Sequence, residues 1–284
     1  MTDLANELST AQNLALIAGK LALKLQNTVT VKQKPNNEGP VTNADLLIDK
    51  FICYELKKNF PNDKIISEES YNSSISIPQN GRVWYIDPID GTYDYIKNGD
   101  DYAVMIGLSI EHEPILGVVY QPKKHIIWKG ITNNKYILSQ KINCKKEIKT
   151  LNIKNRYFPQ NGPILVISRN YSSKFVNYIA KKFKISKVIQ LGSIGLKLAM
   201  IAEGKADFYV TCIKKLKLWD TCAPGAILRA AGGKLCTING EKLVFDNNIT
   251  HKIELFAASP NYNNWFKTIF IEALKNYKSI KKNN

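Results

Sequence analysis

The sequence lacks the patterns that mark a membrane span, a zinc site or a disulfide scaffold. No run of eighteen apolar residues occurs, so no membrane helix is predicted, and residues 1–10 do not show the basic and apolar pattern of a secretory signal. The five cysteines and three histidines are scattered, with no Cys-x-x-Cys pair and no histidine near a cysteine. Zinc binding and a disulfide framework are therefore not expected. A cytoplasmic location is expected instead.

Arginine is also scarce, although the chain is strongly basic. Only four of its 40 lysine and arginine residues are arginine, and 24 acidic residues leave a net charge of +16. Such a charge suits nucleic acid, a membrane surface or a polyanionic substrate. The lysines are spread along the chain, however, and an AT-rich genome would also encode abundant lysine. We expect no obligatory nucleic-acid partner, and peripheral contact of the lysine-rich tail (278–284) with the inner face of the membrane stays open.

The 284 residues can bury a large core, and the apolar periodicity changes near residue 150. Before this point it predicts helices and an antiparallel meander of strands. The predicted helices span 2–26 and 42–60, a loop spans 27–39, and strands lie at 64–67, 83–86, 102–110, 115–120, 126–129 and 135–138. We expect residues 1–150 to form an N-terminal α+β half that carries the acidic motifs described below.

After residue 150 strands and helices alternate, which is typical of an α/β structure. We expect residues 151–284 to form a C-terminal α/β half, joined with the first half in one compact catalytic unit. Strands are predicted at 163–168, 187–191, 206–211, 234–238 and 255–258, and helices at 172–183, 193–202, 219–232 and 262–277.

The stretch Trp84–Thr92 carries the clearest chemical signal. Its apolar start predicts a buried strand, which should end at Asp87 because Pro88 has no N–H for a sheet. Asp90 follows, and Thr92 is the expected N-cap of a helix. Mg²⁺ prefers oxygen ligands and a helix N-terminus prefers phosphate, so the stretch predicts a magnesium-assisted phosphate site. The alternative is a pair of ordinary turns.

Two other acidic positions have an everyday explanation and a functional one. Thr42 followed three residues later by Asp45 resembles a helix capping box, but Asp45 could instead orient a hydroxyl or a water. Glu68 comes directly after the predicted strand 64–67, where an acid on a surface turn would also be ordinary. Neither position decides the function alone.

Four motifs together resemble one protein family. In chain order they are Val41-Thr42-x-Ala-Asp45, Ser67-Glu68-Glu69-Ser70, Asp87-Pro-Ile-Asp90-Gly-Thr92 and Trp219-Asp220-Thr-Cys-Ala-Pro. They are similar to the magnesium-dependent, lithium-sensitive phosphatases, which include inositol monophosphatase, fructose bisphosphatase and the 3'(2'),5'-bisphosphate nucleotidases. The resemblance spans nearly the whole chain. It implies the layered αβαβα sandwich fold of the inositol monophosphatases, with the metal ions between its two halves.

The resemblance also implies roles for individual residues. Two or three Mg²⁺ ions would be held by five groups, of which the first four are carboxylates: Glu68, Asp87, Asp90, Asp220 and the main-chain carbonyl of Ile89. Glu68 is also expected to be catalytic, and Glu68, Ile89, Asp90 and Asp220 are expected to border the substrate. The four acids would offset the charge of ions that also hold a phosphate dianion.

Around this centre the resemblance implies a water-activating pair and a phosphate cradle. The Thr92 hydroxyl, backed by Asp45, would orient or deprotonate the attacking water, and this favours the functional interpretation of Asp45 over the cap alone. The backbone amides of Gly91 and Thr92 would hold phosphate oxygens. Glu69 is given a supporting role only.

Three further stretches are similar to the bisphosphate nucleotidase branch, which includes the bacterial CysQ proteins. They are Val166–Arg169, Gly192–Asp207 and Trp219–Leu228. By this resemblance Ser168, Arg169, Ser193 and Lys197 are expected at the substrate, with Arg169 and Lys197 placed to meet a second phosphate. Gly225 stands where relatives usually carry a larger side chain, and we expect it to enlarge the pocket or to blur the specificity.

The function implied is a magnesium-dependent phosphomonoesterase, a 3'(2'),5'-bisphosphate nucleotidase that hydrolyses adenosine 3',5'-bisphosphate to AMP and phosphate by metal-activated water. One alternative is an inositol monophosphatase. An alternative of another class is a basic RNA- or protein-binding factor on the same fold, although a pure binding module has no need of four clustered acids. A homodimer, common among relatives, stays open.

Overall fold

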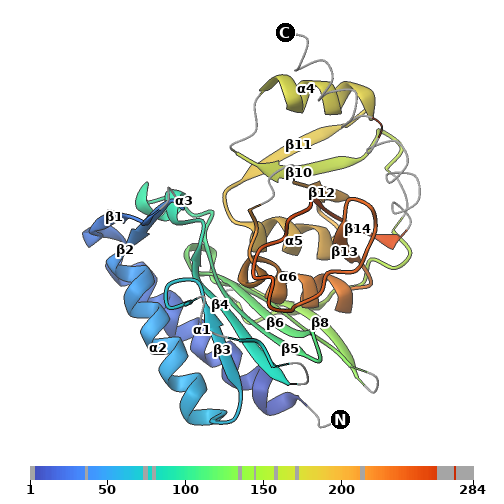
Figure 1. Ribbon diagram of the computed structural model, residues 1–284. Coiled ribbons are helices and arrows are strands. Elements are labelled where there is room, and N and C mark those ends of the chain that lie inside the picture. The colour runs from blue at the N-terminus through green and yellow to red at the C-terminus, as the bar shows by residue number, and fades with distance from the viewer. Residues whose placement is uncertain are drawn as a thin grey trace.

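The protein forms five alternating layers of helix and sheet, which run from α1 and α2 on one side to α4 on the other (Figure 1). This arrangement confirms the predicted αβαβα sandwich. The computed structural model describes residues 4–35, 38–72, 76–78, 81–133, 136–143, 145–156, 159–169, 173–211, 215–260 and 272.

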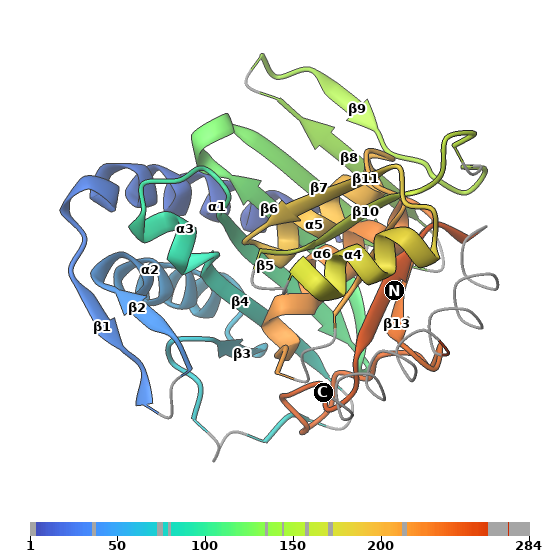
Figure 2. The ribbon, with the colours of Figure 1, turned by 90° about the horizontal axis from the view of Figure 1, so that it is seen from above.

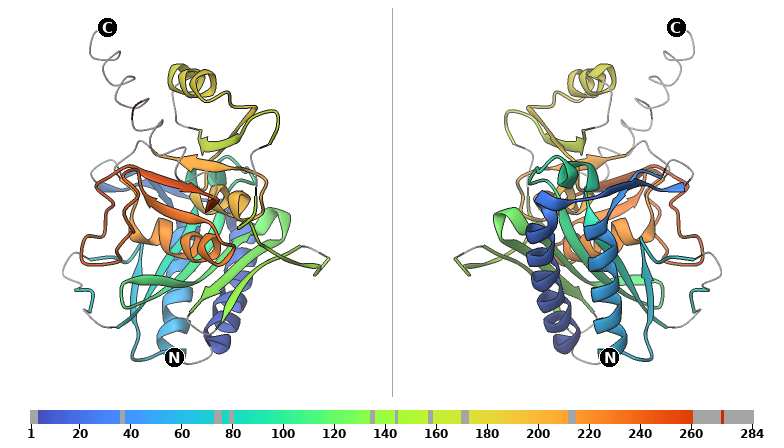
Figure 3. Two further views of the ribbon diagram at one scale, coloured as in Figure 1. Left: turned by 90° about the vertical axis from the view of Figure 1, so that its right-hand side faces the viewer. Right: turned by 90° about the vertical axis from the view of Figure 1, so that its left-hand side faces the viewer.

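The outer layer on the N-terminal side is a pair of helices, α1 (Ala5–Leu25) and α2 (Asn43–Asn59). They run side by side over one face of the large sheet, as the right panel of Figure 3 shows. The predicted apolar stripe of α1 is buried at small alanines, and α2 buries Ile48, Ile52 and Leu56. Small side chains on α1 let it lie close to the sheet.

The second layer is a sheet of seven strands in the order β3-β4-β5-β6-β7-β8-β9. β3 is parallel to β4, and every later pair is antiparallel, so the predicted meander is confirmed. Residues of β5 alternate between a core shared with α1 and α2 and a core shared with α5 and α6. The strands are β3 (Lys64–Ser67), β4 (Arg82–Asp90), β5 (Ala103–Ile110), β6 (Glu113–Gln121), β7 (Ile126–Thr132), β8 (Ile137–Ile142) and β9 (Ile148–Thr150).

The middle layer consists of α5 (Ile194–Ala202) and α6 (Leu218–Ala230), which fill the space between the two sheets. Three glycines lie opposite one another on adjacent strands, Gly107 on β5, Gly117 on β6 and Gly130 on β7. A Cβ at Gly117 would lie 2.0 Å from the carbonyl oxygen of Ala223 in α6. The sheet therefore offers α6 a groove without side chains, and this groove fixes the position of the helix.

The fourth layer is a sheet of five strands in the order β11-β10-β12-β14-β13, and α4 (Ser173–Lys182) covers its outer face (Figure 2). β10 is parallel to β11 and β12, while β14 runs antiparallel to β12 and β13. The expected boundary near residue 150 falls between the last strand of one sheet and the first strand of the other. The strands are β10 (Ile164–Ser168), β11 (Lys187–Leu191), β12 (Phe208–Val210), β13 (Lys234–Thr237) and β14 (Leu255–Ala258).

Two local predictions about the central stretch are wrong. β4 does not end at Asp87 but continues through Pro88 to Asp90. Its pairing with β5 shifts register between Asp87 and Asp90, so the missing N–H of the proline falls in an irregular part of the ladder. The N-cap of α3 (Thr92–Ile96) is Gly91 rather than Thr92. Gly91 has φ 102°, and a Cβ there would lie 2.8 Å from the Asp101 carbonyl oxygen.

The predicted loop over 27–39 is wrong in part. After a short 3₁₀ helix (Gln26–Thr28), β1 (Val31–Gln33) pairs with β2 (Pro40–Thr42). All three β1 side chains are exposed, so no buried alternation signals a strand here. A second 3₁₀ helix spans Pro122–Lys124. The predicted closing helix at 262–277 and the lysine-rich tail lie outside the described residues, and no described helix combines the length and apolarity needed to cross a bilayer.

The glycine groove leads to a stability prediction. Gly117→Ala should lower the free energy of unfolding by about 3 kcal/mol, because the new methyl group forces α6 away from the sheet. The matched control is Gly225→Ala in α6. A Cβ there would lie 3.3 Å from a methyl group of Leu235 and would not approach the backbone of another element. Thermal and urea unfolding would measure both variants. Equal stability of Gly117→Ala and the wild type would contradict the groove.

Candidate active site

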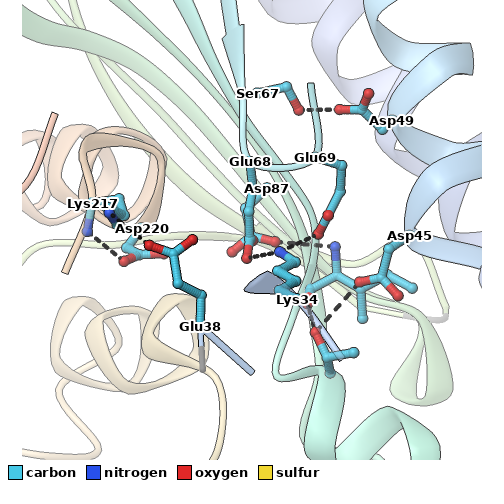
Figure 4. A network of polar contacts seen from close by, with 12 residues as sticks. Lys34, Glu38, Asp45, Asp49, Ser67, Glu68, Glu69, Asp87, Lys217 and Asp220 are labelled. Atoms are coloured by element: carbon cyan, nitrogen blue, oxygen red, sulfur yellow. Dashed lines mark hydrogen bonds and ion pairs between the residues drawn. The ribbon is translucent and has the colours of Figure 1, made fainter. Parts of the chain in front are cut away.

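Four acidic side chains from separate parts of the chain come together where β3 and β4 end beside the start of α6. Glu68 follows β3, Asp87 and Asp90 belong to β4, and Asp220 lies in the first turn of α6. Figure 4 shows Glu68, Asp87 and Asp220 facing a common space. The parallel pairing of β3 and β4 brings their carboxyl ends to one edge, and the glycine groove places α6 beside it.

Asp87 is a buried member of this acidic cluster. Its side chain is only 2% exposed. Burial raises the pKa of Asp87 well above its usual value, and the negative charges of Glu68, Asp90 and Asp220 raise it further. It accepts a hydrogen bond from the Ile89 backbone N–H, at 3.1 Å. The cluster therefore has a strong electrostatic preference for a bound cation.

Asp90 is held by the N-terminus of α5. It accepts hydrogen bonds from the Ser193 hydroxyl at 2.5 Å, from the Ile194 N–H at 3.1 Å and from the Gly195 N–H at 2.7 Å. Burial raises the pKa of Asp90, while the charge of Lys197 and these hydrogen bonds oppose that rise. Ser193 caps α5 by accepting the Leu196 N–H, and it links the C-terminal half to β4.

Asp220 lies in the first turn of α6. Its carboxylate accepts the Lys217 backbone N–H at 2.7 Å, so it caps the helix that carries it. Burial and the charge of Glu68 raise the pKa of Asp220 well above its usual value. Glu38 reaches the same region through an ion pair with Lys217, at 3.7 Å (Figure 4).

A lysine amino group lies against the acidic cluster. The Lys34 Nζ is 2.6 Å from Glu68 and 2.7 Å from Glu69. Burial lowers the pKa of Lys34, but the charge of Glu68 and hydrogen bonds to both glutamates outweigh it and leave the pKa raised. Burial, followed by the charge of Glu68, raises the pKa of Glu69 to about 7. Lys34 thus supplies one positive charge to the cluster.

Asp45 caps a helix and also contacts the Thr92 hydroxyl. It completes the capping box of α2, because its Oδ2 accepts the N–H and the hydroxyl of Thr42 at 2.9 and 2.5 Å. Its Oδ1 faces the Thr92 hydroxyl at 3.4 Å, and that hydroxyl is 3.2 Å from the Ile89 carbonyl oxygen. Burial raises the pKa of Asp45 to about 6, although hydrogen bonds from Thr42 oppose this.

A pocket of about 470 Å³ adjoins the acidic cluster, and it brings together two of the predicted substrate residues, Ser168 and Arg169, with Gly91. Tyr93 and Lys97 also line it. The Arg169 guanidinium forms ion pairs with Asp94 and Asp101. A phosphate that enters this pocket must therefore compete with two carboxylates for the arginine.

Lys197 lies deeper, beneath the pocket rather than on its lining. It is 2% exposed, and its Nζ donates to the carbonyl oxygens of Leu191 and Gly192 at 3.1 and 2.8 Å. Burial lowers the pKa of Lys197 to about 8, against the opposing charges of Asp90 and Asp220. The structure thus places Lys197 as a support for the Leu191–Gly192 turn and as a counter-charge for Asp90.

The donor set fits hard divalent cations. Within the described ranges, no three Asp, Glu, His or Cys side chains are grouped closely enough to hold an ion as they lie. Glu68 instead binds Lys34. The nearby donors are nevertheless all oxygens, as Mg²⁺ prefers. Burial, followed by the charge of Glu68, raises the pKa of Asp87 and of Asp220, so a bound cation would stabilise both carboxylates. Ile89 as a ligand stays a prediction.

Sequence reasoning missed several residues of this site: Lys34, Tyr93, Asp94, Lys97 and Asp101. Lys34 was hidden among many lysines in a predicted loop. Asp94 and Asp101 lie 75 and 68 residues from Arg169 in the chain, so no local pattern links them. The expectation that Gly225 enlarges the substrate pocket is wrong, because Gly225 lines a different cavity beside β13.

Comparisons with known proteins support one assignment. The inositol monophosphatase family model matches residues 3–275. A 3'(2'),5'-bisphosphate nucleotidase CysQ from Buchnera aphidicola is 35% identical over 234 residues, which cover 81% of this chain and 84% of the relative. An inositol-1-monophosphatase from Bacillus subtilis is 28% identical over 256 residues, covering 90% and 91%. The structure of an IMPase from Thermotoga maritima has a TM-score of 0.78 at 20% identity, covering 95% and 99%.

The family match over nearly the whole chain agrees with the acidic cluster and the five layers, and it confirms the resemblance seen in the four motifs. The chain therefore belongs to the inositol monophosphatase family, a family of metal-dependent phosphatases that typically use Mg²⁺.

Proposed function

We propose that this protein is a magnesium-dependent 3'(2'),5'-bisphosphate nucleotidase that hydrolyses adenosine 3',5'-bisphosphate to AMP and phosphate. One observation carries the proposal. An acidic cluster suited to Mg²⁺ adjoins a pocket of about 470 Å³ that contains Arg169 and Lys97. The pocket gives a second phosphate a place beside two cationic side chains. The similarity to the Buchnera nucleotidase supports the same substrate class.

The acidic cluster is assigned to the metal ions. Glu68, Asp87, Asp90 and Asp220 would hold two or three Mg²⁺ ions, with the Ile89 carbonyl as a further ligand. Bound Mg²⁺ supplies a water of lowered pKa and neutralises charge on the phosphate and the leaving oxygen. To free Glu68, Lys34 must move off it. Lys34 lies between β1 and β2 in a hairpin. This hairpin contacts the rest of the protein mainly through α2 and α3.

Thr92 and Asp45 are assigned to the attacking water. If the Thr92 hydroxyl donates its hydrogen to Asp45, its lone pairs are left to accept a hydrogen from water. The water is thereby oriented with its oxygen toward phosphorus. Because the pKa of Asp45 is raised to about 6, its carboxylate is a stronger base than an exposed aspartate and can take the proton through the hydroxyl.

The reacting phosphate is assigned to the start of α3, where the amides of Gly91 and Thr92 precede the first helical hydrogen bonds. The second phosphate is assigned to Arg169, which lies on the pocket wall next to Ser168. Ser193 and Lys197 act behind this wall, by holding Asp90 and the Leu191–Gly192 turn in place.

The finer expectations stay proposals. The similarity to the Bacillus inositol-1-monophosphatase keeps inositol phosphate as the second candidate substrate. Inositol phosphate would place its one phosphate at Thr92 and leave Arg169 without a ligand. A homodimer, a cytoplasmic location and contact of the tail with an anionic membrane are kept as expectations.

The metal assignment predicts opposite effects on stability with and without Mg²⁺. In EDTA, Asp87→Asn should raise the free energy of unfolding by about 1 to 3 kcal/mol, because it removes a buried charge that three carboxylates repel. With Mg²⁺, the wild type should melt at a higher temperature and the variant should lose that rise. Differential scanning fluorimetry measures both effects, and turnover should be abolished.

Asp49→Asn is the control for this experiment, since Asp49 is a buried carboxylate of α2 that accepts from the Ser67 hydroxyl. It should keep the Mg²⁺-dependent rise in melting temperature. A wild-type protein whose melting temperature does not respond to Mg²⁺ would contradict the assignment.

The assignment of the water predicts a coupled pair. Thr92→Val should lower kcat by about 100- to 10,000-fold with little change in KM, because it removes the group that orients the water. Thr92→Ser should keep most of the rate. The loss in the double variant Thr92→Val/Asp45→Asn should be much smaller than the product of the two single losses. Steady-state phosphate release is measured for the wild type, Thr92→Ser, both single variants of the cycle and the double variant. Fully multiplicative losses would mean that Asp45 does not act through Thr92.

The substrate assignment predicts a selective effect of Arg169. The wild type should prefer adenosine 3',5'-bisphosphate to inositol 1-phosphate, and Li⁺ should inhibit it. Arg169→Gln should lower kcat/KM for the bisphosphate by about 10- to 100-fold and leave inositol 1-phosphate unaffected. Arg229→Gln, at a distant arginine paired with Glu113, is the control. Preference for inositol 1-phosphate would overturn the substrate, and no release from either would favour the binding-factor alternative.

A further inference from the structure

A second cavity, of about 370 Å³, lies beside α6 and shares no lining residue with the pocket of Arg169 or with the acidic cluster. One side is the face of α6 that includes Gly225. The opposite side is apolar and consists mainly of Leu235 in β13 and of Leu243 and Phe245 in the segment after it. Cavities of this volume with an apolar lining are typical of sites for small organic molecules.

Three basic side chains also line this α6–β13 cavity, namely Arg229, Lys234 and Lys242. Glu113 forms ion pairs with two of them, with Arg229 at 2.7 Å and with Lys242. In the described part of the chain Lys234 makes no ion pair, and its Nζ only approaches the Gly240 carbonyl oxygen at 3.3 Å. Among the described lining residues there are thus three positive charges, two of which are paired with Glu113, and the cavity has an excess of positive charge.

Gly225 keeps this cavity open at a cost to the helix. Glycine inside a helix is destabilising relative to alanine. The sheet glycines are required by the close approach of the α6 backbone, but a Cβ at Gly225 would meet only a methyl group of Leu235, at 3.3 Å. No backbone contact therefore requires glycine at this position. A larger side chain would fill the cavity between α6 and β13.

We propose that the α6–β13 cavity binds a small organic anion with an apolar or aromatic body. The body would lie between Gly225 and the side chains of Leu235 and Phe245. The anionic group would lie among Arg229, Lys234 and Lys242, where it would share the cations with Glu113. Charge excess, an apolar wall and the open space at Gly225 all come from different residues, and they agree on this class of ligand.

The probe for this proposal is 8-anilino-1-naphthalenesulfonate, an aromatic sulfonate whose fluorescence rises in an apolar site. The full-length protein should bind it saturably at one site. Gly225→Leu should abolish this site by filling it. Arg229→Gln should weaken binding by about tenfold, the change expected from one lost charge-assisted contact. Lys252→Gln removes an exposed charge in an adjoining hollow that does not include Gly225, and it should leave binding unchanged.

Three results would overturn the proposal. The first is unchanged probe binding in Gly225→Leu, with folding confirmed by circular dichroism and by retained phosphatase activity. The second is weak binding at many sites without saturation. The third is displacement of the probe by adenosine 3',5'-bisphosphate in the inactive Asp87→Asn protein, which would place the probe in the substrate pocket. If Gly225→Leu does not fold, the double variant Arg229→Gln/Lys242→Gln takes its place, and unchanged binding there has the same meaning.

Discussion

Repulsion among buried carboxylates is the constraint on which the rest of this structure depends. Burial makes it costly to keep Asp87 and Asp220 ionised, and the charge of Glu68 adds to that cost for each of them. The fold tolerates this because most of the acids are held by groups far from β4 in the chain. Asp90 accepts backbone N–H groups of α5, Asp220 caps α6, and Glu68 binds Lys34. The stability of both halves is thus coupled to the site.

α6 connects the shape of the large sheet to the position of the acidic cluster. Its inner face lies against Gly107, Gly117 and Gly130, where side chains would collide with its backbone. A small change in that contact would move Asp220 relative to Asp87. Gly225, on a different face of the same helix, has no comparable steric reason to be glycine. Glycines thus affect α6 in two different ways. Those of the sheet allow close packing against the helix, and Gly225 leaves an open cavity beside it.

The sequence predicted those parts of the structure whose signals are local. The capping box of Thr42 and Asp45 needs only four residues, and the alternation of strands and helices needs only periodicity. What it could not predict depends on partners distant in the chain. β4 continues through Pro88 because β5 tolerates a register shift there. Arg169 meets Asp94 and Asp101 only after the two halves pack together.

The high net charge of +16 does not explain the proposed recognition of a bisphosphate. The positive charges of Arg169 and Lys97 at the pocket are offset by the negative charges of Asp94 and Asp101, which form ion pairs with Arg169. The local charge is therefore close to balanced, and a second phosphate gains little from long-range attraction in a screened solution. Selectivity must come instead from geometry, because a phosphate competes successfully only where it can replace the two carboxylates as a forked partner of the arginine.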